Sequence, residues 1–170
     1  MLPLTFISAT PVLLVGNGPA FEKRHALLLA AGITALTLCA TRPGAAALDA
    51  ARLVFGAGLS DADNEWLAAE ARARRVPVNI EDVPHLCDVH VPSIVRRGAL
   101  LLTISTAGGA PALSVALREW LSEQFGPEWA AHLEELADLR RRLRASGAKP
   151  PDIIAAMRAH LAAMAWTPLA

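Results

Sequence analysis

A glycine-containing turn near the N-terminus, Gly16-Asn17-Gly18-Pro19, has residue types that suit anion binding. It follows an apolar run at residues 11–15 and precedes a helical pattern. A strand, turn and helix in this order present backbone N–H groups and the positive end of a helix dipole to a pyrophosphate. The first glycine permits the tight turn, and the second lets a phosphate approach the backbone. The motif alone leaves two alternatives open, a phosphate site and a plain structural turn.

A pair of carboxylates, Glu81 and Asp82, follows a predicted strand at residues 76–80. Ligands of open α/β sheets bind beyond the carboxyl ends of the strands, which is where this pair is expected. Two carboxylates that face one pocket there would suit proton transfer. The alternative is an acidic turn that is only solvated.

Four possible metal ligands come next, His85, Cys87, Asp88 and His90. Their side chains are donors that zinc or iron accepts. Their spacing matches no structural zinc motif, so a scattered loop is the preferred interpretation. A transient metal contact remains the alternative.

The elements that must position these residues follow from hydrophobic periodicity. Apolar runs that end in turn residues predict buried strands, and longer amphipathic stretches predict helices, so the first half is expected to form a parallel, doubly wound sheet. Beyond residue 91 we expect one hairpin with Arg96-Arg97-Gly98 as its turn, and then helices only. The predicted strands are 11–15, 33–39, 51–55, 76–80, 93–95 and 99–105, and the predicted helices are 19–31, 61–75, 112–125, 128–144 and 152–165.

Composition excludes several classes of protein. Sixteen basic and sixteen acidic side chains give no net charge, which argues against nucleic-acid and membrane-surface partners. Cys39 and Cys87 cannot build a disulfide framework, so the cytoplasm is the expected compartment. The uncharged stretches 1–21, 26–41 and 98–117 are interrupted by glycine turns or are too short for a bilayer, so no membrane segment is expected.

An ordered set of segments resembles the N-terminal module of siroheme synthases, the precorrin-2 dehydrogenase and sirohydrochlorin ferrochelatase family. The resemblance covers most of residues 11–121. The matching segments are PVLLVGNG (11–18), KRHALLLAAG (23–32), PVNIEDVPHLCD (77–88), VPSIVRRGALLLTIST (91–106) and GGAPALSVALRE (108–119).

This resemblance implies NAD-dependent oxidation of precorrin-2 to sirohydrochlorin. In bifunctional members it also implies insertion of ferrous iron, which is then a substrate. The implied α/β fold has an abbreviated Rossmann-like parallel sheet at 1–91, a dimerisation element at 92–125 and a helical C-terminal domain at 126–170. The implied assembly is a homodimer.

The resemblance also implies roles for individual residues. Asp82 is the catalytic residue, accepting a proton while the nicotinamide takes hydride. No resident metal is implied, and Cys87-Asp88 is the family's usual pair. The implied cofactor-binding residues are Gly16, Asn17, Gly18, Pro19, Ala20, Ala57 and Gly58, and the implied substrate-binding residues are Ser105, Thr106, Gly108, Arg96, Arg97 and Arg118. The basic run 140–144 is either a solvated helix face or a further substrate contact.

Four departures from the family pattern lie in the cofactor half. Phe21 replaces a small residue, the second strand ends without an acid for the ribose, 39–52 is a short alanine-rich bridge, and the cofactor loop is 57–60. Arg42, at the end of the second strand, either favours a 2′-phosphate or is a solvated loop residue. The alternatives to a dehydrogenase are therefore a tetrapyrrole-binding chelatase or carrier, and an NAD-sensing module without catalysis.

Overall fold

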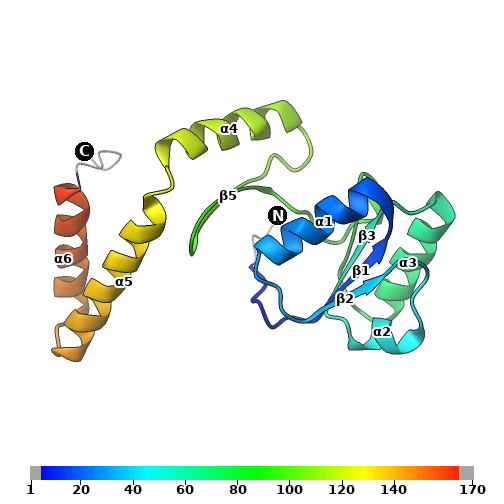
Figure 1. Cartoon of the computed structure of the whole chain (residues 1–170), viewed down its shortest axis with the longest axis horizontal. Coiled ribbons are helices and arrows are strands. Elements are labelled where there is room, and N and C mark those ends of the chain that lie inside the picture. Colours follow the sequence, from blue (N-terminus) through cyan, green and yellow to red (C-terminus); the bar gives the residue numbers. More distant parts are fainter. Residues whose placement is uncertain (1–4, 165–170) are drawn as a thin grey trace. The chain divides into compact units, whose positions relative to one another are not determined.

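The computed structural model describes residues 5–164, and the chain divides into two compact units, Met1–Val91 and Pro92–Ala170. The first unit contains a four-stranded sheet in the order β2-β1-β3-β4 with every neighbouring pair parallel (Figure 1). The strands are β1 (Val12–Gly16), β2 (Leu36–Cys39), β3 (Leu53–Ala57) and β4 (Val78–Ile80). The predicted parallel α/β sheet is confirmed.

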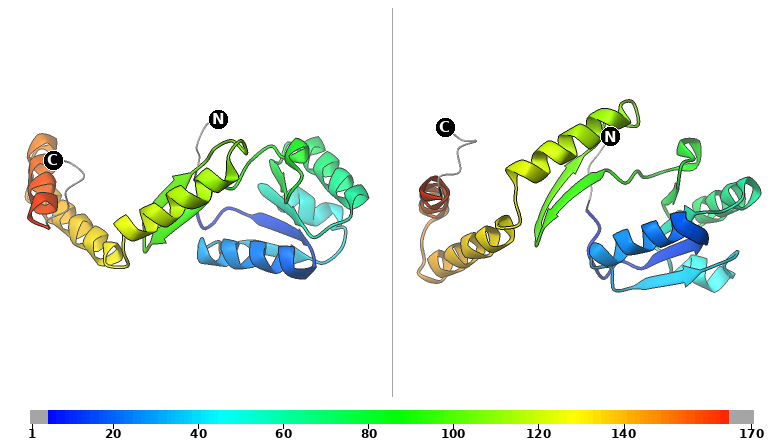
Figure 2. Two further views of the ribbon diagram at one scale, coloured as in Figure 1. Left: turned by 90° about the horizontal axis from the view of Figure 1, so that it is seen from above. Right: turned by 45° about the horizontal axis from the view of Figure 1, so that its top comes forward.

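Helices cover both faces of this sheet (Figure 2). α1 (Gly18–Ala30) packs on one face, and α2 (Ala45–Ala50) and α3 (Asp61–Ala73) pack on the other. Every residue of β1, β3 and β4 is buried, which explains why β1 and β3 are continuous apolar runs without alternation. β4 has one buried polar residue, Asn79, whose amide donates to the Val89 carbonyl at 2.8 Å. The two clusters contain Leu28 of α1 on one face, and Leu48 of α2 with Leu67 of α3 on the other.

The second strand begins later than predicted because the end of α1 uses the preceding residues. Gly32 has a φ of +74°, and its N–H donates to the carbonyl of Leu29 at 2.9 Å. The N–H of Ile33 donates to Leu28 at 3.2 Å, completing a Schellman motif. Gly32 is therefore the predicted helix end, and β2 starts only at Leu36.

After Cys39, which ends β2, the 39–52 bridge contains one short helix, α2, and no further strand. Leu48 anchors that helix in the core at 1% exposure. Among the described residues no strand pairs with the outer side of β2, so it remains the edge of the sheet. This arrangement agrees with the abbreviated sheet that the sequence predicts.

The second unit begins with a hairpin of β5 (Ser93–Arg97) and β6 (Leu100–Ile104). The prediction that Arg96 and Arg97 form its turn is wrong, because both lie in β5 and Arg97 pairs with Leu100. Gly98 has a φ of +57° and supplies the left-handed conformation that a two-residue turn requires. The turn is therefore Gly98-Ala99.

Three helices complete this unit, α4 (Pro111–Gln124), α5 (Trp129–Ala145) and α6 (Pro150–Ala163). α4 packs against β5, and α5 packs against α6 around the buried side chains of Leu136 and Ile153. A further boundary at residue 125 stays a prediction. No helix within residues 5–164 is both long and apolar enough to cross a bilayer.

Candidate functional site

The loops that follow β1 and β3 touch at the carboxyl edge of the sheet. A Cβ at Gly16 would overlap the carbonyl oxygen of Ala57, and a Cβ at Gly58 would overlap that of Asn17. Both glycines also have positive φ, +138° and +69°. Gly16 and Gly58 are thus required for this close approach of two backbones.

Gly18 differs, because a Cβ built there would meet no atom within 4 Å. Its φ of +72° turns the chain into α1, whose first turn contains Pro19 and no acidic side chain. Ala20, in the first turn of α1, packs against the core. The start of α1 therefore has the open space and uncompensated helix dipole that a pyrophosphate needs.

Beside this loop lies an open pocket of about 310 Å³, a volume at the lower end of the range for ligand pockets. It collects residues from the ends of β1, β2 and β3 and from the start of α3. The lining residues are Asn17, Ala40, Thr41, Arg42, Gly58, Leu59, Ser60 and Asp63. Phe21, which replaces the small residue of the family pattern, is half-buried against the core and does not line the pocket.

Asp63 and Arg42 form an ion pair in the pocket. The Nε of Arg42 donates to Oδ1 of Asp63 at 2.6 Å, and the hydroxyl of Ser60 donates to Oδ2 at 2.7 Å. These two bonds hold the pKa of Asp63 below its ordinary value, so the group is an anion at neutral pH. The Arg42 guanidinium also lies over the Trp66 ring, 4.9 Å from its centroid.

Arg42 lies in the loop after β2 with its side chain 51% exposed, as expected of a solvated loop residue, and it is also paired with Asp63 and stacked on Trp66. Sequence reasoning missed Asp63 altogether. A usable signal was present, because Ser60 caps α3 by accepting from the Asp63 N–H at 3.2 Å, the bond expected from a serine three residues before an acid.

The two carboxylates after β4 have different surroundings, and only Asp82 matches the solvated turn that was the alternative to a shared pocket. The Glu81 side chain is 14% exposed and lies 4.0 Å from Arg24 of α1, whose guanidinium covers the Phe55 ring at 5.1 Å. Burial lowers the pKa of Arg24, and the charge of Glu81 counteracts it. Asp82 is exposed at the turn, with a φ of +60°, and does not line the pocket.

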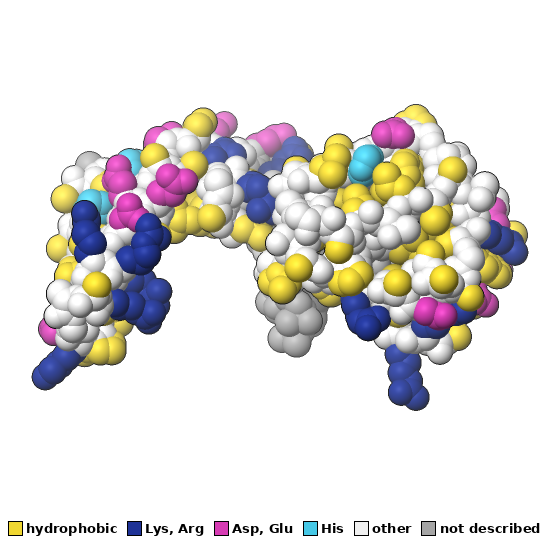
Figure 3. Space-filling model, turned by 60° about the horizontal axis from the view of Figure 1, so that its bottom comes forward, with side chains coloured by type: hydrophobic (Ala, Val, Ile, Leu, Met, Phe, Trp, Pro, Cys, Tyr) yellow, Lys and Arg dark blue, Asp and Glu magenta, His cyan; other side chains and the backbone are white. Residues whose placement is uncertain are grey.

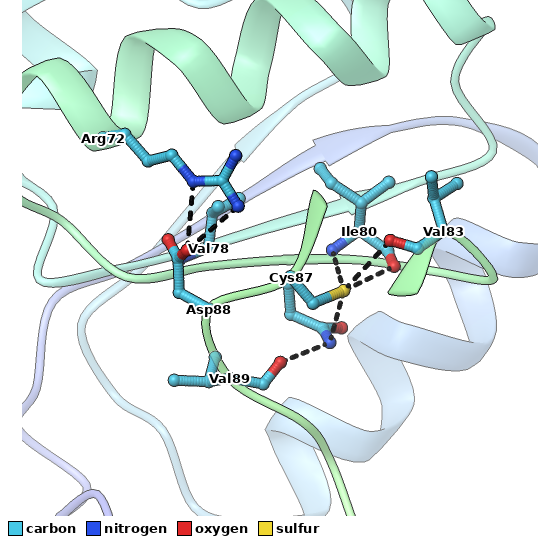
Figure 4. Close-up of polar contacts among 8 residues, drawn as sticks. Arg72, Val78, Ile80, Val83, Cys87, Asp88 and Val89 are labelled. Atoms are coloured by element: carbon cyan, nitrogen blue, oxygen red, sulfur yellow. Dashed lines mark hydrogen bonds and ion pairs between the residues drawn. The ribbon is translucent and has the colours of Figure 1, made fainter. Parts of the chain in front are cut away.

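Cys87 and Asp88 hold the segment carrying Asp82 along the free edge of β4 (Figure 4). The Cys87 sulfur accepts from the Ile80 N–H at 3.3 Å and is 3.2 Å from the Ile80 carbonyl. Asp88 accepts from the Val78 N–H at 3.3 Å and from Arg72 of α3 at 3.0 Å. Within residues 5–164 no three potential ligands assemble a metal site, so the metal-contact alternative receives no support here.

In the second unit, the predicted residues Ser105, Thr106 and Gly108 form the turn that leads into α4. The Thr106 hydroxyl lies 3.1 Å from that of Ser114 and accepts from the Ala110 N–H at 3.3 Å. Gly108 has a φ of +78° and no neighbour within 4 Å of a built Cβ. The hydrogen bonds of Thr106 hold the turn, and the space beside the Gly108 Cα is unoccupied by other residues.

The predicted substrate arginines have different surroundings. Arg97 donates to the carbonyls of Phe125 at 2.6 Å and Ser122 at 3.1 Å, which fixes the end of α4 to β5. Arg96 is exposed, and Arg118 is exposed with a 3.7 Å contact to its neighbour Glu119.

The four arginines of the run 140–144 are all exposed, and basic and acidic side chains mix on the helical end of the chain (Figure 3). Arg141 pairs with Asp138 one turn earlier on α5. This environment favours the solvated-face interpretation of the run.

The sequence is similar to those of known proteins. Siroheme synthase from Methylococcus capsulatus is 31% identical over 160 residues, covering 82% of this chain and 34% of that protein. Siroheme synthase 1 from Aeromonas hydrophila is 33% identical over 167 residues, covering 87% and 35%. The chain thus spans about a third of the length of these relatives.

A solved structure, "SirC, precorrin-2 dehydrogenase", superimposes with a TM-score of 0.75 at 18% identity, covering 99% of this chain and 93% of that one. At this identity the likeness shows the fold. Residues 6–93 match the model of a family described as "Putative NAD(P)-binding". That match covers half of the chain and includes the glycine loop, the pocket and the Glu81-Asp82 turn, and on this basis the chain belongs to that NAD(P)-binding family.

Proposed function

We propose that this protein is an NAD-dependent precorrin-2 dehydrogenase, oxidising precorrin-2 to sirohydrochlorin in siroheme biosynthesis. The observation that carries the proposal is the pocket at the carboxyl edge of the sheet, which adjoins the open glycine Gly18. A ligand site at this edge is typical of open parallel sheets. The similarity to siroheme synthases and to a precorrin-2 dehydrogenase structure supports the choice of substrate.

The residues around Gly18 fit a dinucleotide. Gly18 and the start of α1 would hold the pyrophosphate, and the pocket lined by Asn17 and Gly58 would take one nucleoside. NAD, when bound, supplies a nicotinamide that accepts hydride from the macrocycle.

Asp82 is proposed to accept the proton released when the macrocycle is oxidised. Its carboxylate is exposed and so accessible, and the turn that carries it leads into a segment bonded to β4 through Cys87 and Asp88. The substrate bears several carboxylates, and the exposed guanidinium groups of Arg96 and Arg118 are suited to bind them. Arg97, which follows Arg96 on β5, is also proposed to bind substrate carboxylates.

A homodimer in the cytoplasm is the proposed state of the protein. α4 exposes three large apolar side chains, Leu113, Val115 and Trp120, which a second copy would cover. Insertion of ferrous iron into the product is proposed as a second activity of the same protein.

Anaerobic incubation with precorrin-2 tests the proposal. With NAD, absorption spectra should show sirohydrochlorin, and NADH should form in proportion to it. Adding ferrous iron should convert the product to siroheme if the second activity is present. Absence of oxidation with NAD at saturating concentration would contradict the dehydrogenase assignment.

The second candidate is a tetrapyrrole-binding chelatase or carrier that no longer oxidises. The observation that favours it is the end of β2, where Ala40, Thr41 and Arg42 offer no acid to a cofactor ribose. Calorimetric titration with NAD separates the two candidates. No heat of binding at millimolar NAD would favour the chelatase or carrier.

A further inference from the structure

The pocket contains a carboxylate where the end of β2 has none. Dinucleotide sites of this topology usually hold the adenosine ribose with an acidic residue that follows the second strand. Here that position is Ala40-Thr41-Arg42, and Asp63 of α3 lines the same pocket in contact with Arg42. The carboxylate in this pocket thus comes from α3 and not from the end of β2.

We propose that Asp63 accepts the ribose hydroxyls of the bound dinucleotide and thereby selects NAD over NADP. This inference rests on the proposed function, because it assumes that the pocket takes the adenosine half of the cofactor. It concerns a residue outside the glycine loop and outside the Glu81-Asp82 turn.

The hydrogen bonding of Asp63 leaves capacity for a diol. Each carboxylate oxygen accepts one side-chain hydrogen bond, Oδ1 from Arg42 and Oδ2 from Ser60. An ionised carboxylate offers about four lone-pair positions, so acceptor sites remain for two hydroxyls. The side chain is 35% exposed, and it is held at a fixed place by its two donors.

The same arrangement disfavours a 2′-phosphate. A phosphate there would approach the Asp63 anion, and like charges placed together reduce affinity. The Arg42 charge is already compensated by Asp63 at 2.6 Å, and its plane is stacked on Trp66. Arg42 therefore acts as a positioning residue for Asp63 and leaves no uncompensated cation for the extra phosphate.

Calorimetric titration of the whole chain with NAD and with NADP tests the inference. The wild-type protein should bind NAD at least about tenfold more tightly, since the site is built to accept hydroxyls and opposes added charge. Asp63→Asn should weaken NAD binding and bring the NADP:NAD affinity ratio close to one. Asp61→Asn is the matched control, because Asp61 lies in the same helical turn and does not line the pocket.

Arg42→Ala supplies an independent test, because the two possible roles of Arg42 predict opposite changes in the preference for NAD over NADP. If Asp63 selects the nucleotide, Arg42→Ala leaves its anion held by Ser60 alone and less compensated. NAD should then bind less tightly, and NADP should lose more affinity than NAD because the anion repels its extra phosphate more strongly. If Arg42 instead binds a 2′-phosphate, the wild type prefers NADP and Arg42→Ala removes that preference.

The outcomes separate this inference from the proposed function. NAD binding with a ratio unchanged by Asp63→Asn overturns the role of Asp63 and leaves the dehydrogenase proposal standing. A wild-type preference for NADP likewise overturns the inference alone. Binding of neither nucleotide overturns both.

Discussion

Replacing Arg24 with methionine tests the buried charge pair that supports the Glu81-Asp82 turn. The Arg24 side chain is 11% exposed, and its guanidinium lies 4.0 Å from Glu81 and over the Phe55 ring. Methionine keeps most of the side-chain volume and helix propensity but removes the charge. Glu81 would then be a largely buried anion, with one carboxylate oxygen, Oε2, that already lacks a hydrogen-bond partner.

The expected cost follows from the separation of the two groups. Two unit charges at this distance interact by about 4 kcal/mol at an effective dielectric constant of about 20. Breaking a buried pair by removing one partner typically costs about 3–5 kcal/mol, because the remaining charge stays desolvated. We expect Arg24→Met to lower the free energy of unfolding of the first unit by about 3 kcal/mol. The double variant Arg24→Met, Glu81→Gln should recover part of that loss, since no charge is left unpaired.

Hydrogen exchange read by mass spectrometry is the suitable assay, because it reports the stability of β1 and β3 separately from the second unit. Lys23→Met is the matched control, since Lys23 is the neighbouring cation on α1 and is exposed. Equal exchange rates in the Arg24→Met and Lys23→Met proteins would refute the reasoning. So would a double variant that is less stable than Arg24→Met alone.

Three further predictions concern other parts of the chain. Gly16→Ala should lower the free energy of unfolding of the first unit by more than about 3 kcal/mol, because the added Cβ would overlap the Ala57 carbonyl and the φ of Gly16 is +138°. Gly18→Ala, where the added Cβ meets no atom within 4 Å, should cost only about 1–2 kcal/mol. Urea titrations measure both values. The pKa of Asp63 in the folded protein is lowered from 3.8, so its contribution to stability is present above pH 3.8 and is lost as the pH falls through the folded pKa. Below about pH 4, the melting temperature of Asp63→Asn should therefore depend less on pH than that of the wild type. Arg97→Met should cost about 1.5–3 kcal/mol through the two lost bonds to α4 and increase hydrogen exchange at residues 93–97.

Much of the fold could be predicted from sequence because local signals and burial agree. The runs that became β1 and β3 are apolar throughout, as strands covered on both faces must be. Gly32 and Ser60 mark helix ends through their own backbone and side-chain chemistry. These features need no knowledge of distant contacts.

The candidate site was less predictable because its geometry depends on contacts between distant segments. The Arg42–Asp63 pair joins residues separated by twenty-one positions, and the hydrogen bonds of Arg97 reach twenty-eight positions ahead. The neighbours Glu81 and Asp82 diverge because one meets Arg24 and the other turns outward in a left-handed conformation. Nothing in the local sequence distinguishes those two environments.

Asp82 is the proposed proton acceptor in the NAD-dependent oxidation. The direct measurement is the anaerobic rate of NADH formation from precorrin-2 in wild-type and Asp82→Ala proteins, with NAD affinity measured in parallel. We expect the variant to lose about 10²–10⁴ in rate while binding NAD as the wild type does, because Asp82 lies outside the nucleotide pocket. An Asp82→Ala protein that oxidises precorrin-2 at the wild-type rate would contradict the account.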